Sequence, residues 1–357
     1  MKDIFKKIPE IVSYRKVELI SGGISNRNYR IISANPKKSD QLVTLLPNMK
    51  TWWKADKEEL ITNLYKNKNI PSASIINTGY INYNNTTYRY ILKEFVKGKD
   101  FYTFLLEEKN PTTKDWISLL TQLGNILGTL HSFSMGSSYG LLREGSTSGS
   151  DAKNIPAAPT WQKYIDKLMT NRKYFSKKLD KKRSYRNITG VDIQNIFKYS
   201  YKLYKDHRNV LTKVTQPFLI HYDMLFKNII VSYNIQLARW EIVAIIDNEW
   251  ASAGDPDIDL IQIENAAYFS SHKEVFRTYW NFFTRAYVRK KTVSKDIENK
   301  RLIYHMMRSL FYLIEVYGMD QSEIITRDTK NIQNIEANYL FLERLINSGK
   351  VDFSLYG

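Results

Sequence analysis

The sequence contains no cysteine, which excludes disulfide bonds, thiolate metal sites and cysteine nucleophiles. It also lacks any apolar run of the roughly 18 residues that a membrane-spanning helix needs. The first stretch, "MKDIFKKIPEIVSYRK", carries charges and a proline where a signal peptide requires an apolar segment. These absences lead us to expect a soluble, cytoplasmic protein without a membrane partner.

The chain has 357 residues, more than one ordinary core holds at roughly 150 residues per domain. A hydrophobic content of 43% supports a well-buried interior, and nothing in the composition predicts disorder. The formal net charge is +17, with basic clusters at 171–186 and 287–291. Such a charge fits a nucleic-acid or acidic-lipid surface, a solvated lysine-rich face, or attraction of a polyanionic small molecule. Net charge alone does not choose among these.

The first hundred residues are rich in strand-forming segments. These are 16–21, 25–33, 41–47, 74–81 and 86–95, with one helical segment at 54–69. Gly22-Gly23 separates the first two of them, as in a β-hairpin. We therefore predict a five-stranded antiparallel sheet accompanied by one helix.

The remainder of the chain is mainly helical in pattern. Apolar residues at helical spacing predict a long helix over 113–133, and further helices follow at 161–178, at 190–213 and from 257 onwards. Short strands interrupt them near 219–231 and 240–247. The sequence thus predicts an α+β protein with a β-rich N-terminal lobe (1–95) and a larger, mainly helical C-terminal lobe (96–357).

Polar side chains interrupt an apolar run in "LIHYDMLFKNIIV" (219–231), which contains His221, Asp223 and Asn228. A second run, "WEIVAIID", ends on Asp247. Oxygen ligands without soft ligands nearby suit a hard cation such as Mg²⁺. A further aspartate that accepts a proton from a hydroxyl would complete the requirements of phosphoryl transfer from a nucleotide.

The pattern His-x-Asp-x4-Asn, followed by "IIDNEWASAGDPDIDL" (245–260), resembles the catalytic core of the aminoglycoside phosphotransferase and choline kinase family. The segments "LISGGISNRNYRI" (19–31), "YILKEFVKGKDF" (90–101) and "LGTLHS" (127–132) resemble the nucleotide loop, hinge and long helix of that family, in the same order. The resemblance implies a protein-kinase-like fold with two lobes. It also implies an ATP- and Mg²⁺-dependent transfer of the γ-phosphate to a hydroxyl of a small molecule.

The resemblance assigns a role to each matching residue. Asp223 is the expected catalytic base, Asn228 and Asp247 are the expected Mg²⁺ ligands, and His221 is expected to brace the loop. The side facing the substrate is expected to contain Glu249, Trp250 and Asp255, with Glu249 on either the substrate or the second-metal side. The backbone that covers the phosphates is expected to be that of Ser21, Gly22, Gly23, Ile24, Ser25 and Asn26. The adenine is expected to border Glu94, Phe95 and Val96.

Two positions depart from the family's pattern. Tyr222 stands where the family usually has glycine, and we expect it to adopt ordinary backbone angles. The third strand carries Thr44 and Leu45 where a lysine or arginine should grip the phosphates. The cations that could substitute are Lys50, Lys93 and Arg27, and the expected partner carboxylate on the helix is Glu58 or Glu59.

The sequence leaves the acceptor open. The loop "SGGISNRNYR" favours an amino-alcohol such as choline or ethanolamine, whereas "GDPDIDL" favours an aminoglycoside or another sugar. The missing third-strand cation motivates an alternative, a non-catalytic pseudokinase-like binding or scaffold protein. We do not expect binding of nucleic acid, because no nucleic-acid-binding module is recognisable. The choice between ATP and GTP and the oligomeric state also stay open.

Overall fold

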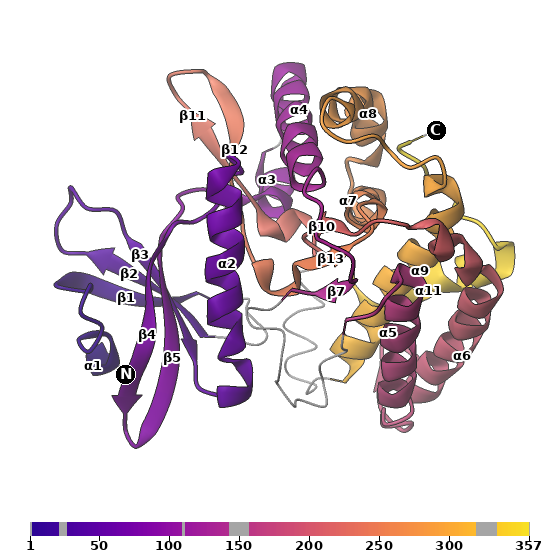
Figure 1. Cartoon of the computed structure of the whole chain (residues 1–357), viewed down its shortest axis with the longest axis horizontal. Helices are drawn as coiled ribbons and strands as arrows, with labels where there is room; N and C mark the ends of the chain where they lie inside the picture. Colours follow the sequence, from indigo (N-terminus) through magenta and orange to yellow (C-terminus); the bar gives the residue numbers. More distant parts are fainter. Residues whose placement is uncertain (1, 21–26, 109–110, 143–156, 319–333, 357) are drawn as a thin grey trace. The chain divides into compact units, whose positions relative to one another are not determined.

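The protein is described by a computed structural model that covers residues 2–20, 27–108, 111–142, 157–318 and 334–356. The chain divides into two compact units, which we describe separately (Figure 1). Unit 1 consists of Met1–Lys109, Leu142–Asn154 and Lys227–Trp250. Unit 2 consists of Asn110–Leu141, Ile155–Phe226 and Ala251–Gly357. Unit 1 thus contains residues 96–109 and 227–250 in addition to the five-stranded sheet. The lobe boundary expected after residue 95 stays a prediction.

Unit 1 is built on a five-stranded sheet in the order β1-β2-β3-β5-β4, in which every neighbouring pair is antiparallel. The strands are β1 (Tyr14–Ile20), β2 (Arg27–Ser33), β3 (Gln41–Leu46), β4 (Ile75–Tyr83) and β5 (Thr86–Glu94). The predicted antiparallel sheet is confirmed, including the pairing of the first two strands. The turn between those strands, residues 21–26, lies outside the described residues.

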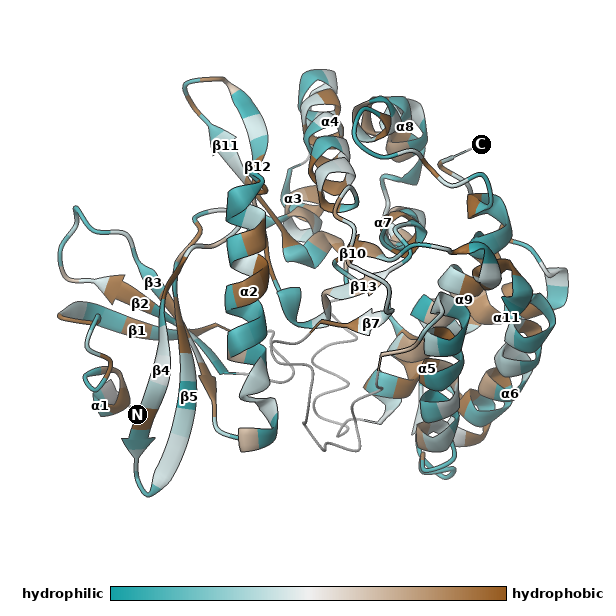
Figure 2. Ribbon diagram, in the orientation of Figure 1, coloured by the Kyte–Doolittle hydropathy of each residue, from teal (hydrophilic) through white to brown (hydrophobic). Residues whose placement is uncertain are grey.

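The two faces of this sheet bury different partners. One face packs Val43 and Leu45 of β3 against Phe5 of the short helix α1 (Lys2–Phe5) and its neighbours. The other face packs Leu46 against Ala55 of α2 (Trp53–Asn67), the helix predicted at 54–69. Side chains alternate between the faces of a strand, so Thr44, two residues before Leu46, shares the α2 face. Figure 2 shows apolar and polar residues alternating along both α2 and the strands.

A second, three-stranded sheet completes unit 1, in the order β12-β11-β6. Its strands are β6 (Lys99–Asp100), β11 (Ile229–Asn234) and β12 (Arg239–Ile245), and α3 (Phe101–Glu107) follows β6 directly. Phe104 of α3 meets the ring of Trp240 at 4.8 Å between centroids. The pairing of Ile229 with Ile245 brings the start of β11 and the end of β12 together. This end of the hairpin leads to Asn228 on one strand and to Asp247 on the other.

Unit 2 is mainly helical, as the sequence predicts. Its helices are α4 (Thr113–Leu130), α5 (Trp161–Ser176), α6 (Gly190–His207), α7 (Asp257–Phe269), α8 (Lys273–Val288), α9 (Ile297–Tyr317) and α11 (Ile335–Ser348). Its strands are β7 (Gly140–Leu141), β8 (Ser184–Tyr185), β9 (Ile188–Thr189), β10 (Phe218–Ile220) and β13 (Ser252–Gly254). Short 3₁₀ helices occur in both units, at Met49–Thr51, Arg208–Lys213, Phe226–Asn228 and Asn248–Trp250. None of the helices described here is both long and apolar enough to cross a membrane.

Helices α4 and α8 lie side by side in unit 2 (Figure 1). Thr112 and Asp115 form a capping box that starts α4, and His131 caps its end. Gly124 and Gly128, one turn apart, allow the close contact. A Cβ atom at Gly124 would lie only 2.3 Å from the carbonyl oxygen of Phe283 on α8. The absence of a side chain at this position therefore sets the spacing of the two helices.

We expect Gly124→Ala to lower the free energy of unfolding by about 2 kcal/mol, because the overlap with α8 outweighs the better helix propensity of alanine. Thermal and urea unfolding monitored by circular dichroism measure the change. Lys114→Ala, at an exposed position of the same helix, is the matched control and should leave stability nearly unchanged. An equally stable Gly124→Ala protein would contradict the close packing.

Candidate active site

The loop that carries Asp223 is held by a buried carboxylate of α7. Asp259 is 0% exposed and accepts hydrogen bonds from the backbone N–H groups of His221 (2.7 Å) and Tyr222 (2.8 Å). A charged acceptor makes such bonds stronger than bonds between neutral groups. Asp259 thus anchors the loop that follows β10.

Asp259 is also bound by the histidine at the end of α4. His131 lies with Nε2 at 3.1 Å from Asp259 Oδ2 and with Nδ1 at 3.0 Å from the Tyr287 hydroxyl. Burial raises the pKa of Tyr287 well above its ordinary value, so this hydroxyl keeps its proton. The two ring nitrogens of His131 thus contact one buried hydroxyl and one buried carboxylate. His131 is therefore a fully buried helix-end histidine that fixes the anchor.

A second α7 side chain, that of Gln262, binds the backbone of the residues directly before and after Asp223. Gln262 donates from Nε2 to the carbonyl oxygen of Tyr222 (2.9 Å) and accepts at Oε1 from the N–H of Met224 (2.8 Å). Gln262 lies three residues after Asp259, so both side chains project from one face of the helix. The backbone before and after Asp223 is consequently fixed by α7, which leaves the aspartate carboxylate on a rigid support. His221, fully buried, accepts from the Asp223 N–H at Nδ1 (3.3 Å).

Tyr222 does not adopt the ordinary backbone angles that we expected. Its φ is +65°, in the left-handed region that favours glycine, and this conformation costs roughly 1 kcal/mol or more for another residue. The prediction is therefore wrong. The two flanking hydrogen bonds, to Asp259 and to Gln262, hold the residue in this conformation. The tyrosine ring lies edge-on to that of Trp161, 6.4 Å between centroids.

Asp223 faces a cation of α9 in the same unit. Arg308 Nη1 lies 3.6 Å from Asp223 Oδ1, and the two side chains are 18% and 15% exposed. The separation is that of a long ion pair and exceeds that of a good hydrogen bond. The sequence gave no signal for Arg308, because it lies 85 residues downstream in an ordinary helical pattern.

Unit 1 contains the two expected metal ligands. The carbonyl oxygen of Asn228 accepts from the N–H of Ile246 (2.9 Å), so Asn228 and Asp247 occupy adjoining ends of β11 and β12. Asn228 is buried and Asp247 is exposed. Asp247 has a φ of +65°, a strained angle of the kind that often occurs at functional positions.

These two residues offer one amide and one carboxylate oxygen. Mg²⁺ is commonly bound through one or two carboxylates together with phosphate oxygens and water, so the donor chemistry fits that ion. No group of three or more His, Cys, Asp or Glu side chains able to hold a metal by themselves occurs in the described ranges. A site made of protein ligands alone therefore finds no support among those residues.

The segment after Asp247 is held by lysines of α2. Lys54 Nζ lies 2.6 Å from the Glu249 carboxylate, and the fully buried Lys57 donates to the Glu249 carbonyl oxygen (2.7 Å). Glu249, expected on the substrate side, is thus neutralised within unit 1. Trp250 is 43% exposed. The substrate roles of both residues stay predictions.

Asp255, the third residue expected on the substrate side, is buried in unit 2. Lys300 Nζ lies 2.8 Å from the carboxylates of both Asp255 and Asp257, and the Tyr304 hydroxyl donates to Asp255 (2.6 Å). Burial, together with the charge of Asp255, raises the pKa of Asp257 to about 7 despite the nearby lysine. Although burial opposes it, the two carboxylates raise the pKa of Lys300. Lys300, Asp255 and Asp257 therefore form one buried cluster of charged side chains in unit 2.

A lysine–glutamate pair lies between the five-stranded sheet and α2. Lys93 of β5 forms an ion pair with Glu58 of α2 at 3.0 Å, and both side chains are 11% exposed. Lys93 stands opposite Leu42 of β3, so it shares the α2 face with Thr44. The other two candidate cations, Lys50 and Arg27, are exposed. Thr44 itself donates to Asn28 Oδ1 (2.7 Å).

The residues expected at the adenine follow Lys93 directly. The N–H groups of Glu94 and Phe95 donate to the carbonyl oxygens of Ser74 and Asp40, 2.9 Å each. Recognition of a base by these two residues would therefore use groups other than their N–H. The adenine role of Glu94, Phe95 and Val96 stays a prediction. The phosphate role assigned to Ser21–Asn26 falls on residues that lie outside the described ranges.

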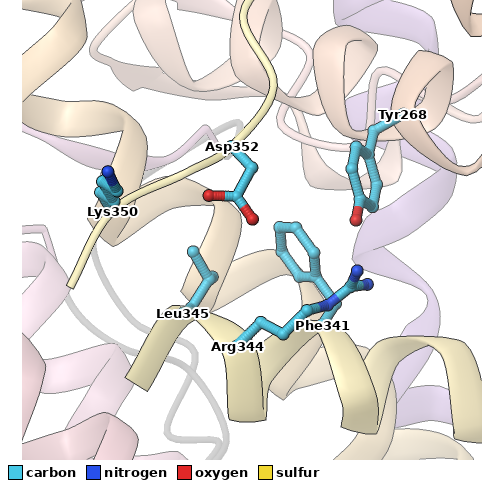
Figure 3. A pocket seen from close by; sticks show the side chains of 6 residues that line it. All are labelled: Tyr268, Phe341, Arg344, Leu345, Lys350 and Asp352. Carbon is cyan, nitrogen blue, oxygen red and sulfur yellow. The ribbon is translucent and has the colours of Figure 1, made fainter. Parts of the chain in front are cut away.

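The pocket in Figure 3 is unrelated to these residues. It lies in unit 2 and has a cavity volume of only about 10 Å³, far below the size typical of ligand sites. Its lining residues are Tyr268, Phe341, Arg344, Leu345, Lys350 and Asp352. No predicted site residue lines it, and we assign it no function.

We expect Asp259→Asn to lower the free energy of unfolding by about 3 kcal/mol, because an amide cannot replace a carboxylate that accepts from two N–H groups and a histidine. Urea unfolding monitored by tryptophan fluorescence measures the loss. Asp206→Asn, at an exposed position of α6, is the control. Equal stability of the two variants would show that the loop does not depend on Asp259.

Comparison with known proteins adds to this geometry. The structure of the GDP and kanamycin complex of APH(2″)-IIIa is similar, with a TM-score of 0.53, 15% identity, and 98% of each chain covered. The structure of WaaP in complex with acyl carrier protein is a weaker match, with a TM-score of 0.43, 10% identity, and coverage of 88% of this chain and 92% of that one. The first match supports the predicted kinase-like α+β fold. No curated protein matches the sequence.

The family itself is shown by the sequence. The profile of the phosphotransferase enzyme family, APH, matches residues 16–289. This range includes the five-stranded sheet apart from the first two residues of β1, the Asp223 loop, and the ends of β11 and β12. The chain therefore belongs to the phosphotransferase enzyme family.

Proposed function

We propose that this protein transfers the γ-phosphate of ATP to a hydroxyl of a small molecule, with Asp223 as the base. The observation that carries the proposal is the loop around Asp223, whose backbone is fixed on both sides by Asp259 and Gln262. A carboxylate on a preorganised support suits a group that must meet a reacting hydroxyl in one geometry. Membership of a phosphotransferase family agrees with this chemistry.

In the proposed reaction the acceptor oxygen forms a bond with the γ-phosphorus as the bond to the β–γ bridging oxygen breaks, which releases ADP. The acceptor's proton passes to the Asp223 carboxylate. His221 does not take this proton, because it is fully buried and bonded to the loop backbone. Asn228 and Asp247 would hold Mg²⁺, which supplies neutralisation of the phosphate charge.

We further propose that Lys93 replaces the cation missing from β3. It is the one of the three candidates that is ion-paired with a carboxylate of α2, and it lies on the sheet face of Thr44. In protein kinases a strand lysine paired with a helix glutamate contacts the phosphates. A lysine on the neighbouring strand, oriented by Glu58, would serve the same purpose here.

The acceptors expected from the sequence are amino-alcohols such as choline, aminoglycosides and other sugars. A screen of ATP consumption over these classes is the direct way to find the substrate. The non-catalytic alternative rests on the absence of a cation on β3. It predicts that Mg²⁺-ATP does not raise the thermal stability of the protein, whereas binding of a ligand to the native state would raise it.

We expect Asp223→Asn to reduce turnover by about 10³-fold or more and to change the affinity for Mg²⁺-ATP by less than about threefold, since the lost carboxylate acts on the acceptor. A coupled assay of ADP release measures turnover, and isothermal titration calorimetry measures nucleotide affinity. Asp352→Asn, at an exposed position of unit 2, is the control. Normal turnover of Asp223→Asn would refute the proposed base.

We expect Lys93→Met to weaken the binding of Mg²⁺-ATP by about tenfold or more, because a charge-assisted contact with phosphate is lost. The matched control is Lys50→Met, which removes an exposed lysine of the same unit. Calorimetric titration with Mg²⁺-ATP gives both affinities. Because Lys93→Met leaves Glu58 buried and unpaired, its melting curve is recorded in parallel, and Lys93→Met/Glu58→Gln removes both charges. Unchanged affinity in a folded variant would assign Lys93 a purely structural role.

A further inference from the structure

The two carboxylates expected on the substrate side are each paired with a lysine. Glu249 is paired with Lys54 at 2.6 Å in unit 1. Asp255 is paired with Lys300 at 2.8 Å in unit 2 and is almost fully buried. A carboxylate that is engaged with a lysine attracts a second cation only weakly. Neither residue therefore offers the negative charge that an ammonium group of an acceptor would need.

The side chain that faces Asp223 is itself a cation, the guanidinium of Arg308. Arg308 approaches Asp223 only at 3.6 Å, and its Nε is buried without a hydrogen-bond partner among the described residues. A guanidinium carries several N–H donors in a planar fork that matches carboxylate and phosphate groups. An unpaired donor of this kind is costly to bury, and a bound anion would relieve the cost.

A second guanidinium, that of Arg172, contacts α9 one helical turn after Arg308. Arg172 of α5 stacks on the ring of Phe311 at 4.9 Å, and Phe311 lies three residues after Arg308, on the same face of α9. Burial lowers the pKa of Arg172 because its charged form is partly desolvated, and Glu315 and Tyr222 oppose that shift. The hydroxyl of Tyr222 is also buried without a hydrogen-bond partner in the described part of the chain. Tyr222 directly precedes Asp223, so these donors belong to one region of unit 2.

We propose that the acceptor alcohol carries an anionic group, a phosphate or a carboxylate, which binds the guanidinium groups of Arg308 and Arg172 beside Asp223. This inference rests on the proposed function and narrows its substrate class. A cationic acceptor is disfavoured, because its ammonium group would lie next to Arg308 with like charge. Arg308 also holds the anion close to the base, so that the acceptor hydroxyl meets the Asp223 carboxylate.

The test compares the binding of matched probes to the full chain by isothermal titration calorimetry. The probes are glucose 6-phosphate, gluconate, glucose, glucosamine and inorganic phosphate. A saturating non-hydrolysable ATP analogue with Mg²⁺ is present, so that phosphate does not report on the nucleotide site. We expect at least one anionic probe to bind the wild type more tightly than glucose does. We expect Arg308→Gln to weaken that binding by about tenfold or more.

The controls separate this inference from the proposed function. Arg285→Gln removes an exposed arginine of α8 and should leave the binding of every probe unchanged, whereas Arg308→Lys should keep part of the anion affinity. If Arg308→Gln fails to fold, Arg172→Gln is measured in its place. Anion binding that depends on Arg308 supports the inference even if no acceptor stimulates ATP consumption, in which case only the proposed reaction fails. The inference is overturned if no anionic probe binds better than glucose, if glucosamine binds best, or if the arginine variants bind anions as the wild type does.

Discussion

The fully buried carboxylate of Asp259 is the constraint on which the candidate site depends. A buried charge without compensation costs several kcal/mol, and here the compensation comes from two backbone N–H groups and from His131. The two N–H groups belong to His221 and Tyr222, the residues directly before Asp223. The bonds that compensate the charge of Asp259 therefore also position the Asp223 loop. Because Asp259 needs these donors to remain buried, the loop and α7 stabilise each other.

In unit 1 the buried or half-buried charges are those of lysines, and each of them also has a partner. Three lysines on one side of the five-stranded sheet each face an acceptor: Lys54 and Lys57 bind Glu249, and Lys93 binds Glu58. Two of these contacts tie α2 to the segment that follows Asp247. The helix thereby links the lysine–glutamate pair to the end of β12, where one of the expected metal ligands lies. A shift of α2 would alter both contacts at once.

Local sequence patterns predicted the sheet and the long helices, the family resemblance implied the kinase-like arrangement, and neither gave the connections within the site. Strand-forming segments and Gly22-Gly23 predicted the antiparallel sheet, and helical periodicity predicted α4 close to its observed ends. The positive φ of Tyr222 could not be read from the chain, because the hydrogen bonds that impose it come from α7. The pairing of Lys93 with Glu58 depends on the register of β5 against β3. The sequence does not give this register, so it could not choose Lys93 from the three candidate cations. Gln262 could have been found as the residue one turn after Asp259, whereas nothing marked Arg308.

The loop of Asp223 is fastened by α7, while the arginine that faces its carboxylate belongs to α9. Support of Asp223 and the charge of its surroundings are thus encoded in separate stretches of the chain. Under the proposed function, substitutions in α9 would change which compounds are accepted without disturbing the geometry of the aspartate. Divergence within such a family can then proceed by exchange of a few positions on one helix, and directed evolution toward a new acceptor has a compact region to randomise.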